Sequence, residues 1–250
     1  MANEKILVID VGGTHVKLLA TGQTEPRRFD SGIGLTPQGM VKGVLELVKD
    51  WNYNAITIGF PAPVKTGKIA LEPHNLGTGW VGFDFEKAFA CPIRFINDAS
   101  MQALGSYEGG KMLFLGLGTG LGSTLIAEGV VLPMELGHLP YKKDTFEDYV
   151  GQRGMDKYGK KKWREFVPEV IAILSAALLP DYVVLGGGNT KKLEKLPEGV
   201  HLGSNDNAFK GGFRLWETIN PARVKRDTEV DISRAKPSFE LATIPKQKKK

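Results

Sequence analysis

Short apolar runs alternate along the chain with longer stretches in which apolar residues recur at helical spacing. Most of the short runs are rich in Val, Ile, Leu and Phe and end at Gly, Pro or Asn-Asp, as buried β-strands do. The predicted strands cover residues 5–11, 16–20, 55–60, 93–97, 112–117, 122–126 and 182–186. The predicted helices cover residues 37–50, 98–108, 146–158, 161–179 and 190–196. Strands that alternate with helices indicate an α/β protein with a mainly parallel sheet.

One pattern occurs twice: a strand, a glycine-rich turn and a second strand, at residues 5–20 and again at 112–126. Because turns this short join strands that run in opposite directions, each copy is expected to form an antiparallel hairpin. The repeat suggests two related α/β domains, residues 1–110 and 111–216, around a cleft. The pattern fades after Trp216, so residues 217–250 are expected to form a surface arm with a mobile, basic end.

The composition, with 42% hydrophobic and 24% charged residues, is that of a soluble globular protein. No apolar run approaches the roughly 20 residues that span a bilayer. The N-terminal residues enter a predicted strand almost at once, without the pattern of a signal or transit peptide. The single cysteine, Cys91, excludes an internal disulfide and a multi-cysteine zinc site. We therefore expect a cytoplasmic protein without a membrane partner.

The formal net charge of +5 is a weak sign of a polyanionic partner, because four of these charges come from the tail at residues 246–250. The rest of the chain is then near +1, and no nucleic-acid partner is expected. A basic cluster remains at residues 157–164. It fits either the solvated face of a helix or a groove for a polyanion, and the sequence does not choose between them.

Two glycine-rich turns, Asp10-Val-Gly-Gly-Thr14 and Gly116-Leu-Gly-Thr-Gly-Leu-Gly-Ser123, carry the most informative local patterns. Glycine permits positive φ angles and close approach of the backbone, so that successive N–H groups can converge on an anion. Thr14 and Thr119 add hydroxyl donors, whereas Asp10 is an acceptor that suits Mg²⁺ or its waters. A tight hairpin would explain one such turn, but two in corresponding positions favour a phosphate site.

Two familiar phosphate motifs do not fit. A Rossmann fingerprint needs its glycines to open a helix, and here residues 123–127 continue as a strand. A P-loop needs Gly-Lys followed by Ser or Thr, and no Gly-Lys pair of this chain is followed by either. A third glycine cluster, Val183-Val-Leu-Gly-Gly-Gly-Asn-Thr190, ends a predicted strand. It suits either a nucleotide or the close packing of a helix on a strand.

Polar residues follow the predicted strand at 93–97, where Asn97 and Asp98 either cap the next helix or provide a hydroxyl-binding amide beside a general base. Glu135-Leu-Gly-His138 adds a carboxylate and an imidazole, and Glu147 opens a later helix. Each group alone fits a surface position. Together with two phosphate turns they indicate a polyol site, because carboxylates, imidazole and amide can each bind vicinal hydroxyls. A metal site at Glu135 and His138 lacks further ligands.

With these motifs the chain resembles the ROK family (repressor, open reading frame, kinase), which includes sugar kinases with the actin-like ATPase (ribonuclease H-like) fold. The resemblance covers residues 5–216. It includes both glycine turns, Ile-Asn-Asp98, Glu-Leu-Gly-His138 and Leu-Gly-Gly-Gly-Asn189. Residues 72–80 and 160–163 look most like the polyphosphate glucokinase branch of the family.

The resemblance implies a role for each matched residue. Asp98 would be the base that takes the proton from the 6-hydroxyl of the sugar, and Asp10 would lie toward Mg²⁺. The other hydroxyls would be held by Asn75, Asn97, Glu135, His138 and Glu147. The transferred phosphoryl group would be cradled by Gly12, Gly13, Thr14, Gly118, Thr119 and Gly120. The nucleotide would contact Gly186, Gly187, Gly188 and Asn189.

The implied activity is that of a hexose kinase, most simply a glucokinase, that uses ATP, polyphosphate or both with Mg²⁺ and forms a homodimer. A kinase for mannose or an N-acetylated sugar is the alternative. A sugar-responsive regulator of the same family is less favoured, since such regulators carry an N-terminal helix-turn-helix and few residues precede the first predicted strand. Many relatives have a cysteine-rich zinc segment after Glu-x-Gly-His. This chain has Tyr141-Lys-Lys-Asp144 instead, so no zinc is expected.

Overall fold

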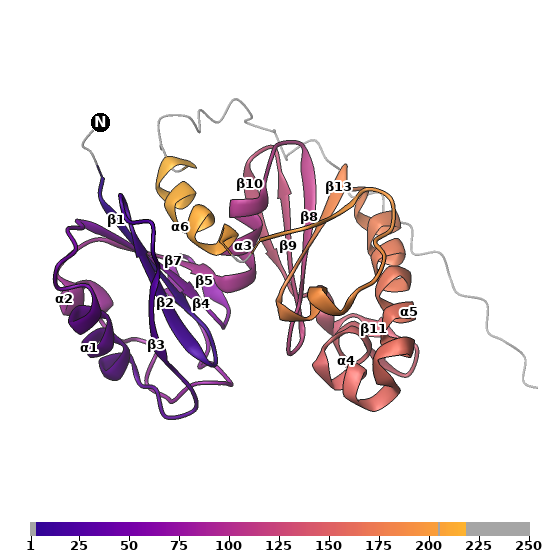
Figure 1. Cartoon of the computed structure of the whole chain (residues 1–250), viewed down its shortest axis with the longest axis horizontal. Coiled ribbons are helices and arrows are strands. Elements are labelled where there is room, and N and C mark those ends of the chain that lie inside the picture. Colours follow the sequence, from indigo (N-terminus) through magenta and orange to yellow (C-terminus); the bar gives the residue numbers. More distant parts are fainter. Residues whose placement is uncertain (1–3, 205, 219–250) are drawn as a thin grey trace, which may run out of the picture. The chain divides into compact units, whose positions relative to one another are not determined.

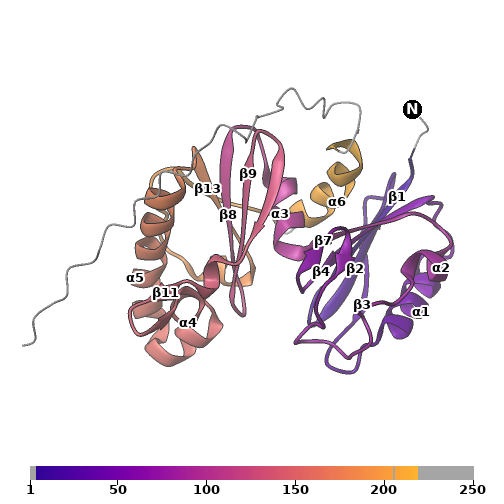
Figure 2. The same cartoon turned by 180° about the vertical axis from the view of Figure 1, so that it is seen from behind.

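Figures 1 and 2 show the computed structural model, which describes residues 4–204 and 206–218. Most of the arm predicted at 217–250 lies outside the described residues. Within them the chain forms two five-stranded sheets and two small two-stranded sheets. No helix in the described part of the chain combines the length and the apolar character needed to cross a membrane.

The first sheet has the strand order β3-β2-β1-β4-β7. Its strands are β1 (Ile6–Val11), β2 (His15–Ala20), β3 (Arg27–Asp30), β4 (Ala55–Phe60) and β7 (Ile93–Asn97). β1 pairs antiparallel with β2 and parallel with β4, which confirms the predicted hairpin and the parallel core of the sheet. All six residues of β4 are buried, as expected of a strand covered on both faces.

The second sheet has the order β10-β9-β8-β13-β14 and repeats the same plan. Its strands are β8 (Lys111–Leu117), β9 (Leu121–Ala127), β10 (Val130–Met134), β13 (Tyr182–Gly186) and β14 (Val200–Leu202). The predicted hairpin at 112–126 is confirmed as β8 and β9, and β13 joins β8 in parallel. The small sheets pair β5 (Val64–Lys65) with β6 (Lys68–Ile69) and β11 (Pro140–Tyr141) with β12 (Asp144–Thr145).

Helices cover both faces of each sheet. α1 (Pro37–Leu47) and α2 (Phe85–Phe89) pack on one face of the first sheet. α4 (Phe146–Val150) and α5 (Gln152–Leu178) cover the outer face of the second sheet. α3 (Asp98–Ser106) and α6 (Asn207–Thr218) lie between the two sheets, where a third core joins residues of both (Figures 1 and 2). Two short 3₁₀ helices, η1 (Leu136–His138) and η2 (Gly188–Lys192), connect these elements.

Several predicted helix boundaries need correction. The helix expected at 146–158 ends at Val150, and α5 starts two residues later and runs to Leu178. The break expected between two helices at 159–160 is a kink inside α5, where Gly159 has a φ of 78°. The helix expected at 190–196 is the 3₁₀ turn η2. α6 was not predicted, since two adjacent glycines in its middle weaken the helical signal and only packing stabilises it.

The crossing of α3 and α6 is the tightest contact between the two sheets. A Cβ on Gly105 would fall on the Asn207 carbonyl, and one on Gly211 would fall on the Met101 carbonyl, so the two backbones touch. The Thr57 hydroxyl on β4 donates to the Gly212 carbonyl at 2.7 Å, which fixes α6 to the first sheet. On the other side of α3, a hydrogen bond of 2.9 Å joins Ser100 to Thr124 of β9.

We predict that Gly105→Ala lowers the free energy of unfolding by about 3 kcal/mol, because the methyl group forces α3 and α6 apart. Gly39→Ala in α1 is the matched control: its new Cβ would meet its nearest neighbours at 3.4 and 3.5 Å, an ordinary contact. In the control, the helix propensity of alanine should raise stability by about 0.5–1 kcal/mol. Chemical denaturation measures both. A Gly105→Ala protein as stable as the wild type would contradict the prediction, because it would show that a methyl group fits between α3 and α6.

Candidate functional site

A cavity of about 630 Å³ is lined by residues of both sheets and of α3. Twelve of the residues singled out by sequence line it: Gly12, Gly13, Asn75, Asn97, Asp98, Gly118, Thr119, Gly120, Glu135, His138, Glu147 and Gly187. Five others do not: Asp10, Thr14, Gly186, Gly188 and Asn189. The fold thus brings together motifs that lie as much as 175 residues apart in sequence, from Gly12 to Gly187.

Asn97 and Asp98 occupy the junction where β7 ends and α3 begins. The Asn97 side-chain oxygen accepts from the N–H groups of Ala99 at 3.0 Å and Ser100 at 3.3 Å, so Asn97 is the N-cap of α3. Its amide nitrogen has no partner among the described residues and remains available at the cavity wall. Asp98 is the first helical residue, and its carboxylate accepts from the Ala99 N–H at 2.7 Å. Capping therefore orients both side chains.

The first glycine turn joins β1 to β2. Gly12 N–H donates to the His15 carbonyl at 3.0 Å, and the Ser31 hydroxyl donates to the Gly12 carbonyl at 2.5 Å. Neither Gly12 nor Gly13 has a positive φ, so the expectation that glycine is needed here for its φ freedom is wrong. The requirement is space: a Cβ on Gly13 would lie 3.1 Å from the Asn75 Cβ. Gly13 thereby lets the loop around Asn75 pack on the turn.

The second glycine turn joins β8 to β9, and hydrogen bonds from η2 and α5 fix its backbone. The Asn189 amide donates to the Gly118 carbonyl at 3.0 Å, and the Gln152 N–H at the start of α5 donates to the same carbonyl at 3.0 Å. Gly187 packs on β8 so closely that a Cβ would collide with the Leu117 carbonyl, and its φ is 85°. The third glycine cluster thus packs against the second turn, and Asn189 is buried in that contact.

Glu135, His138 and Glu147 reach the cavity from η1 and α4. His138 Nε2 lies 3.8 Å from Glu147 Oε1, and a Cβ on Gly120 would collide with the Glu147 carboxylate. Glu147 therefore lies directly on the second glycine turn. A Cβ on Gly137 would meet the Leu121 carbonyl at 2.9 Å, so this glycine lets η1 approach β9.

An aromatic cluster lies at the segment 141–144, which replaces the zinc segment of many relatives. The Tyr141 ring centroid lies 5.2 Å from that of Phe146 and 5.0 Å from that of Tyr149, and Tyr149 contacts Phe166 of α5 at 5.1 Å. Phe146 is buried and immediately precedes Glu147. Packing of aromatic rings therefore holds the start of α4 against the second sheet.

The loop from Glu72 to Val81 contains contacts that sequence reasoning missed. Glu72 lines the cavity, and its two carboxylate oxygens accept from the N–H groups of Trp80 at 3.1 Å and Val81 at 3.0 Å. Trp80 is fully buried and anchors the far end of the loop. Glu72 thus closes the loop that carries Asn75. The available signal was a lone acidic residue, next to Pro73, in a loop that also contains Asn75.

Gln102 is a second missed residue of the cavity. It follows Asp98 by four positions on α3, and residues at this spacing share one face of a helix. That spacing was visible in the sequence.

Carboxylates dominate the electrostatics of the cavity. Burial, together with the negative charges of Asp10 and Glu135, raises the pKa of Asp98 to about 6, while the Ala99 N–H opposes this effect. Burial also raises the pKa of Asp10, and Lys17 opposes that rise, with its Nζ 3.6 Å from Asp10 Oδ2. The cavity therefore holds a proton acceptor that titrates near neutral pH.

The described residues contain no group of three or more His, Cys, Asp or Glu side chains arranged to hold a metal ion. A Mg²⁺ ion in a phosphate site needs less, because one or two carboxylates together with phosphate oxygens and water complete its shell. Asp10 meets this requirement: it is a largely buried carboxylate beside the first glycine turn, and its one ion-pair partner in the described part of the chain is Lys17. The chemistry of the donor set thus fits Mg²⁺ bound together with a phosphate ligand.

The basic cluster at 157–164 does not line the cavity. Within it Lys157 lies 3.6 Å from Asp144, while Lys162 pairs with Glu165 and Arg164 with Glu194. Ion pairs of this kind between α5 side chains and nearby acidic residues are typical of a solvated helix face, the first of the two alternatives that the sequence left open.

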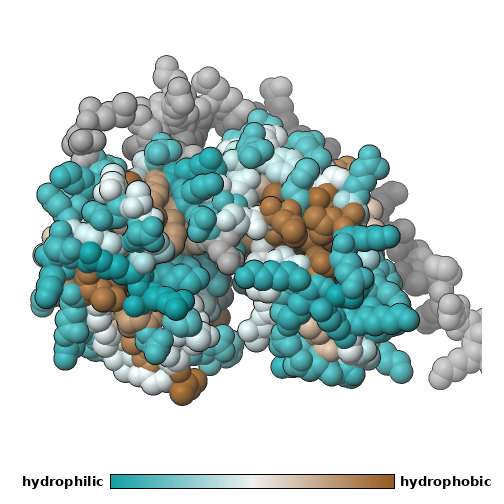
Figure 3. Space-filling model, in the orientation of Figure 1, coloured by the Kyte–Doolittle hydropathy of each residue, from teal (hydrophilic) through white to brown (hydrophobic). Residues whose placement is uncertain are grey.

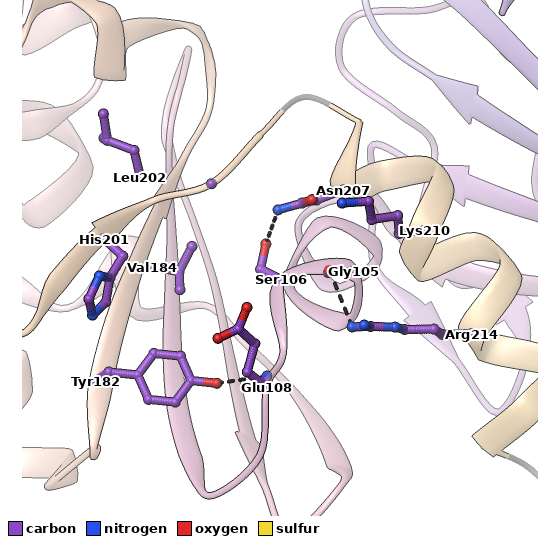
Figure 4. A pocket seen from close by; sticks show the side chains of 11 residues that line it. Gly105, Ser106, Glu108, Tyr182, Val184, His201, Leu202, Asn207, Lys210 and Arg214 are labelled. Carbon is purple, nitrogen blue, oxygen red and sulfur yellow. Dashed lines mark hydrogen bonds between the residues drawn. The ribbon is translucent and has the colours of Figure 1, made fainter. Parts of the chain in front are cut away.

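A second hollow, of about 550 Å³, lies among α3, α6, β13 and β14 (Figure 4). None of the residues singled out by sequence lines it. Its polar groups largely serve the helix crossing: Asn207 donates to the Ser106 hydroxyl at 2.8 Å, Arg214 to the Gly105 carbonyl at 3.2 Å, and the Glu108 N–H to the Tyr182 hydroxyl at 2.9 Å. We therefore regard the cavity with Asp98 as the candidate functional site.

Comparison with known proteins identifies similar chains. The ROK family profile matches residues 6–154. The polyphosphate glucokinase of Mycobacterium leprae (strain TN) is 27% identical over 209 residues, which cover 75% of this chain and 64% of that protein. The polyphosphate glucokinase of Mycobacterium tuberculosis (strain CDC 1551 / Oshkosh) is 26% identical over 209 residues, which cover 75% and 78% of the two chains. The chain thus matches just under two thirds of the length of the first of these relatives.

Among solved structures, the inorganic polyphosphate/ATP-glucomannokinase of Arthrobacter sp. strain KM superposes with a TM-score of 0.71 at 21% sequence identity. The superposition covers 84% of this chain and 97% of that structure. A likeness at this level of identity concerns the fold. It confirms the expected actin-like ATPase (ribonuclease H-like) fold, with two α/β sheets that both line the candidate site.

We predict that Asp98→Asn raises stability above pH 6 and leaves it unchanged below about pH 4. Because the folded-state pKa of Asp98 is raised to about 6, its contribution to stability is complete below the unfolded value of about 3.9 and is lost as pH rises through 6. A neutral amide avoids that loss, which should be about 1–2 kcal/mol at pH 8, because solvent at the cavity wall screens part of the charge of the largely buried Asp98. Denaturation of both proteins across this pH range measures it. A constant difference between them would contradict the electrostatic account.

Proposed function

Since this chain belongs to the ROK family, we propose that it is a hexose kinase, and specifically a glucokinase that transfers a phosphoryl group from polyphosphate or ATP to the 6-hydroxyl of glucose. The observation that carries the proposal is the position of Asp98, which shares one cavity with both glycine turns and with a set of polyol-binding side chains. The relatives named as polyphosphate glucokinases and glucomannokinase support the choice of acceptor and donor. Mannose or an N-acetylated hexose is the alternative acceptor.

In this proposal Asp98 accepts the proton of the 6-hydroxyl as that oxygen attacks the terminal phosphorus of the donor. A carboxylate with a pKa of about 6 is largely ionised at neutral pH and remains basic enough to take the proton. Its place as the first residue of α3 fixes the direction of the carboxylate. The reaction breaks the bond between the terminal phosphorus and the bridging oxygen, which leaves with the shortened donor.

The sugar would be held by hydrogen bonds around its ring. The free amide of Asn97 and the carboxylates of Glu135 and Glu147 suit the hydroxyls as donors and acceptors. His138, 3.8 Å from Glu147, would bind together with that carboxylate, and Asn75 would close the site from the loop packed on Gly13. Several polar groups fixed by the fold can orient one hydroxyl toward the donor, which is a large part of the catalysis of phosphoryl transfer.

The two glycine turns would cradle the transferred phosphoryl group with backbone N–H groups at Gly13 and Thr14 and at Thr119 and Gly120. The N–H groups of Gly12 and Gly118 donate to the His15 and Gly120 carbonyls, so these two glycines would shape the turns instead. Asp10 would hold Mg²⁺, which neutralises charge on the donor phosphates when bound. Lys17 beside Asp10 adds a positive charge to the same place.

On the nucleotide side, Gly186, Gly187 and Gly188 would face ATP. Asn189 would act by holding the Gly118 carbonyl, a bond that leaves its amide committed to the protein.

A homodimer in the cytoplasm completes the proposal. Hydrophobic residues gather over the part of the second sheet that carries β13 (Figure 3), and the segment after β13 includes the exposed side chains of Leu196 and Leu202. Such residues suit an interface between copies. Sedimentation equilibrium of the full chain measures the oligomeric state.

The first experiment is a coupled assay for glucose 6-phosphate with Mg²⁺, with ATP and long-chain polyphosphate each as the sole donor. We expect product with at least one donor and none without Mg²⁺. Mannose and N-acetylglucosamine in place of glucose test the alternative acceptors. Product from none of these sugars with either donor would reject the proposed kinase activity.

Replacement of Asp98 by Asn or Ala should lower kcat by about a thousandfold, the usual contribution of a general base. Wild-type kcat/KM should fall as pH drops below about 6, because the protonated carboxyl cannot accept the hydroxyl proton. Circular dichroism and thermal unfolding verify that both variants are folded. Substantial activity in a folded Asp98→Ala protein would remove Asp98 from this role.

Glu72→Gln should raise the KM for the sugar about tenfold while changing kcat little. The amide replaces one of the two oxygens that accept from Trp80 and Val81, so the loop that carries Asn75 loosens. Glu46→Gln, at an exposed position of α1, is the matched control and should leave both constants unchanged. An equal loss of kcat and kcat/KM in Glu72→Gln would argue that Glu72 acts in the chemical step rather than on sugar binding.

A further inference from the structure

Two positive side chains lie side by side on the first sheet, next to Asp10. Lys17 on β2 is directly opposite Asp10 on β1 and also directly opposite Arg28 on β3. Residues directly opposite in antiparallel strands share one face of the sheet. Asp10, Lys17 and Arg28 therefore form a row across three strands, called here the Asp10–Arg28 row. With strands about 4.8 Å apart, the row is about 10 Å long.

The inner end of the row lies next to the candidate active site, since Gly12, two residues after Asp10, lines the cavity. Two residues before Asp10 on the same face, Val8 packs against Gly212 of α6, and Leu19, two residues after Lys17, packs against the core between the sheets. The row thus lies on the face that α3 and α6 cover further along the strands. At its inner end the Asp10 carboxylate is close enough to raise the pKa of Asp98. At its outer end Arg28 lies on β3, the last strand of the sheet in the described residues.

The charges of the row are incompletely balanced. Lys17 Nζ lies 3.6 Å from Asp10 Oδ2. Arg28 is exposed and has no hydrogen bond or ion pair with any described residue. Asp30, on the same face of β3, lies 3.5 Å from His15 on β2. Like charges directly opposite each other in a sheet are destabilising. Lys17 and Arg28 form such a pair, and an anion bound over both would remove the repulsion.

We propose that the Asp10–Arg28 row binds the chain of inorganic polyphosphate behind the phosphoryl group that is transferred. This inference rests on the proposed kinase function and names the donor. The terminal phosphate would lie between the glycine turns, and the following phosphates would contact Lys17 and then Arg28.

The direction of the row separates polyphosphate from ATP. It leads from the site across the first sheet toward β3, whereas the glycines proposed for the nucleotide belong to the second sheet, where Gly187 packs on Leu117. If the base of ATP lies at the second sheet, its phosphates run from that sheet to the glycine turns and end there. They do not extend across the first sheet to Arg28. A linear chain of phosphates carries no base and matches positive charges set in a line.

The test measures binding of long-chain polyphosphate and of ATP, each with Mg²⁺, to the full-length wild type, Lys17→Thr and Arg28→Thr; threonine retains the β propensity of the strands. Arg28→Thr should weaken polyphosphate binding about tenfold, and ATP binding much less. Lys17→Thr should weaken both, because Lys17 lies beside Asp10. The slope of log affinity against log salt concentration should fall by about 1 in each variant for polyphosphate. Ligand-free Arg28→Thr should unfold at the same or a higher temperature than the wild type, since the repulsion is gone.

Lys161→Thr on α5 is the control for a lost surface charge and should bind both donors as the wild type does. Wild-type polyphosphate affinity in Arg28→Thr, or an equal loss for both donors in that variant, would overturn the inference. A loss in Lys161→Thr as large as in Arg28→Thr would assign the polyanion to α5 instead and overturn it as well. The sugar kinase assay with ATP separates the two proposals. If the protein has ATP-dependent kinase activity but Arg28→Thr binds polyphosphate as the wild type does, the role of the Asp10–Arg28 row is rejected and the proposed kinase function stands.

Discussion

The backbone contact between α3 and α6 is the constraint on which the rest of the structure depends. At Gly105 and Gly211 each helix touches a carbonyl group of the other, with no side chain between them. Each helix is also tied to a sheet, α6 through the bond from Thr57 to Gly212 and α3 through the bond between Ser100 and Thr124. Because both sheets line the cavity, the positions of all the candidate site residues depend on this crossing.

The crossing also explains why the reactive end of α3 is well defined. Asp98 is the first residue of a helix whose other end is locked by the contact with α6, so the carboxylate is presented from a rigid support. Asn97 caps the same turn. A buried acid beside two other carboxylates costs stability, and the raised pKa of Asp98 is the sign of that cost. Strain of this kind at one place in an otherwise well-packed protein is typical of a functional site.

Glycine has a different part in this site from the one its flexibility suggests. Gly13, Gly120 and Gly137 have no positive φ, and at each of them an atom of a neighbouring element lies within 3.1 Å of where a Cβ would be. The neighbours are the loop with Asn75, the carboxylate of Glu147 and the β9 backbone. The glycines thus bring sugar-side residues into contact with phosphate-side turns, which is what a transfer between two substrates requires.

The sequence by itself determined the central strands of both sheets, the two hairpins and the motifs, because alternation, glycine turns and capping residues act over a few neighbouring positions. It missed the outer strands β3, β10 and β14. From Asp98, Asn97 and the two turns it also predicted most of the cavity wall. It could not reveal α6, because the two central glycines of this helix disfavour a helix unless α3 packs against it. It also could not reveal the hydrogen bonds from the Trp80 and Val81 N–H groups to Glu72. The pairing of Lys17 with both Asp10 and Arg28 likewise depends on strand register. Such contacts join residues that are distant along the chain, so only the tertiary structure decides them.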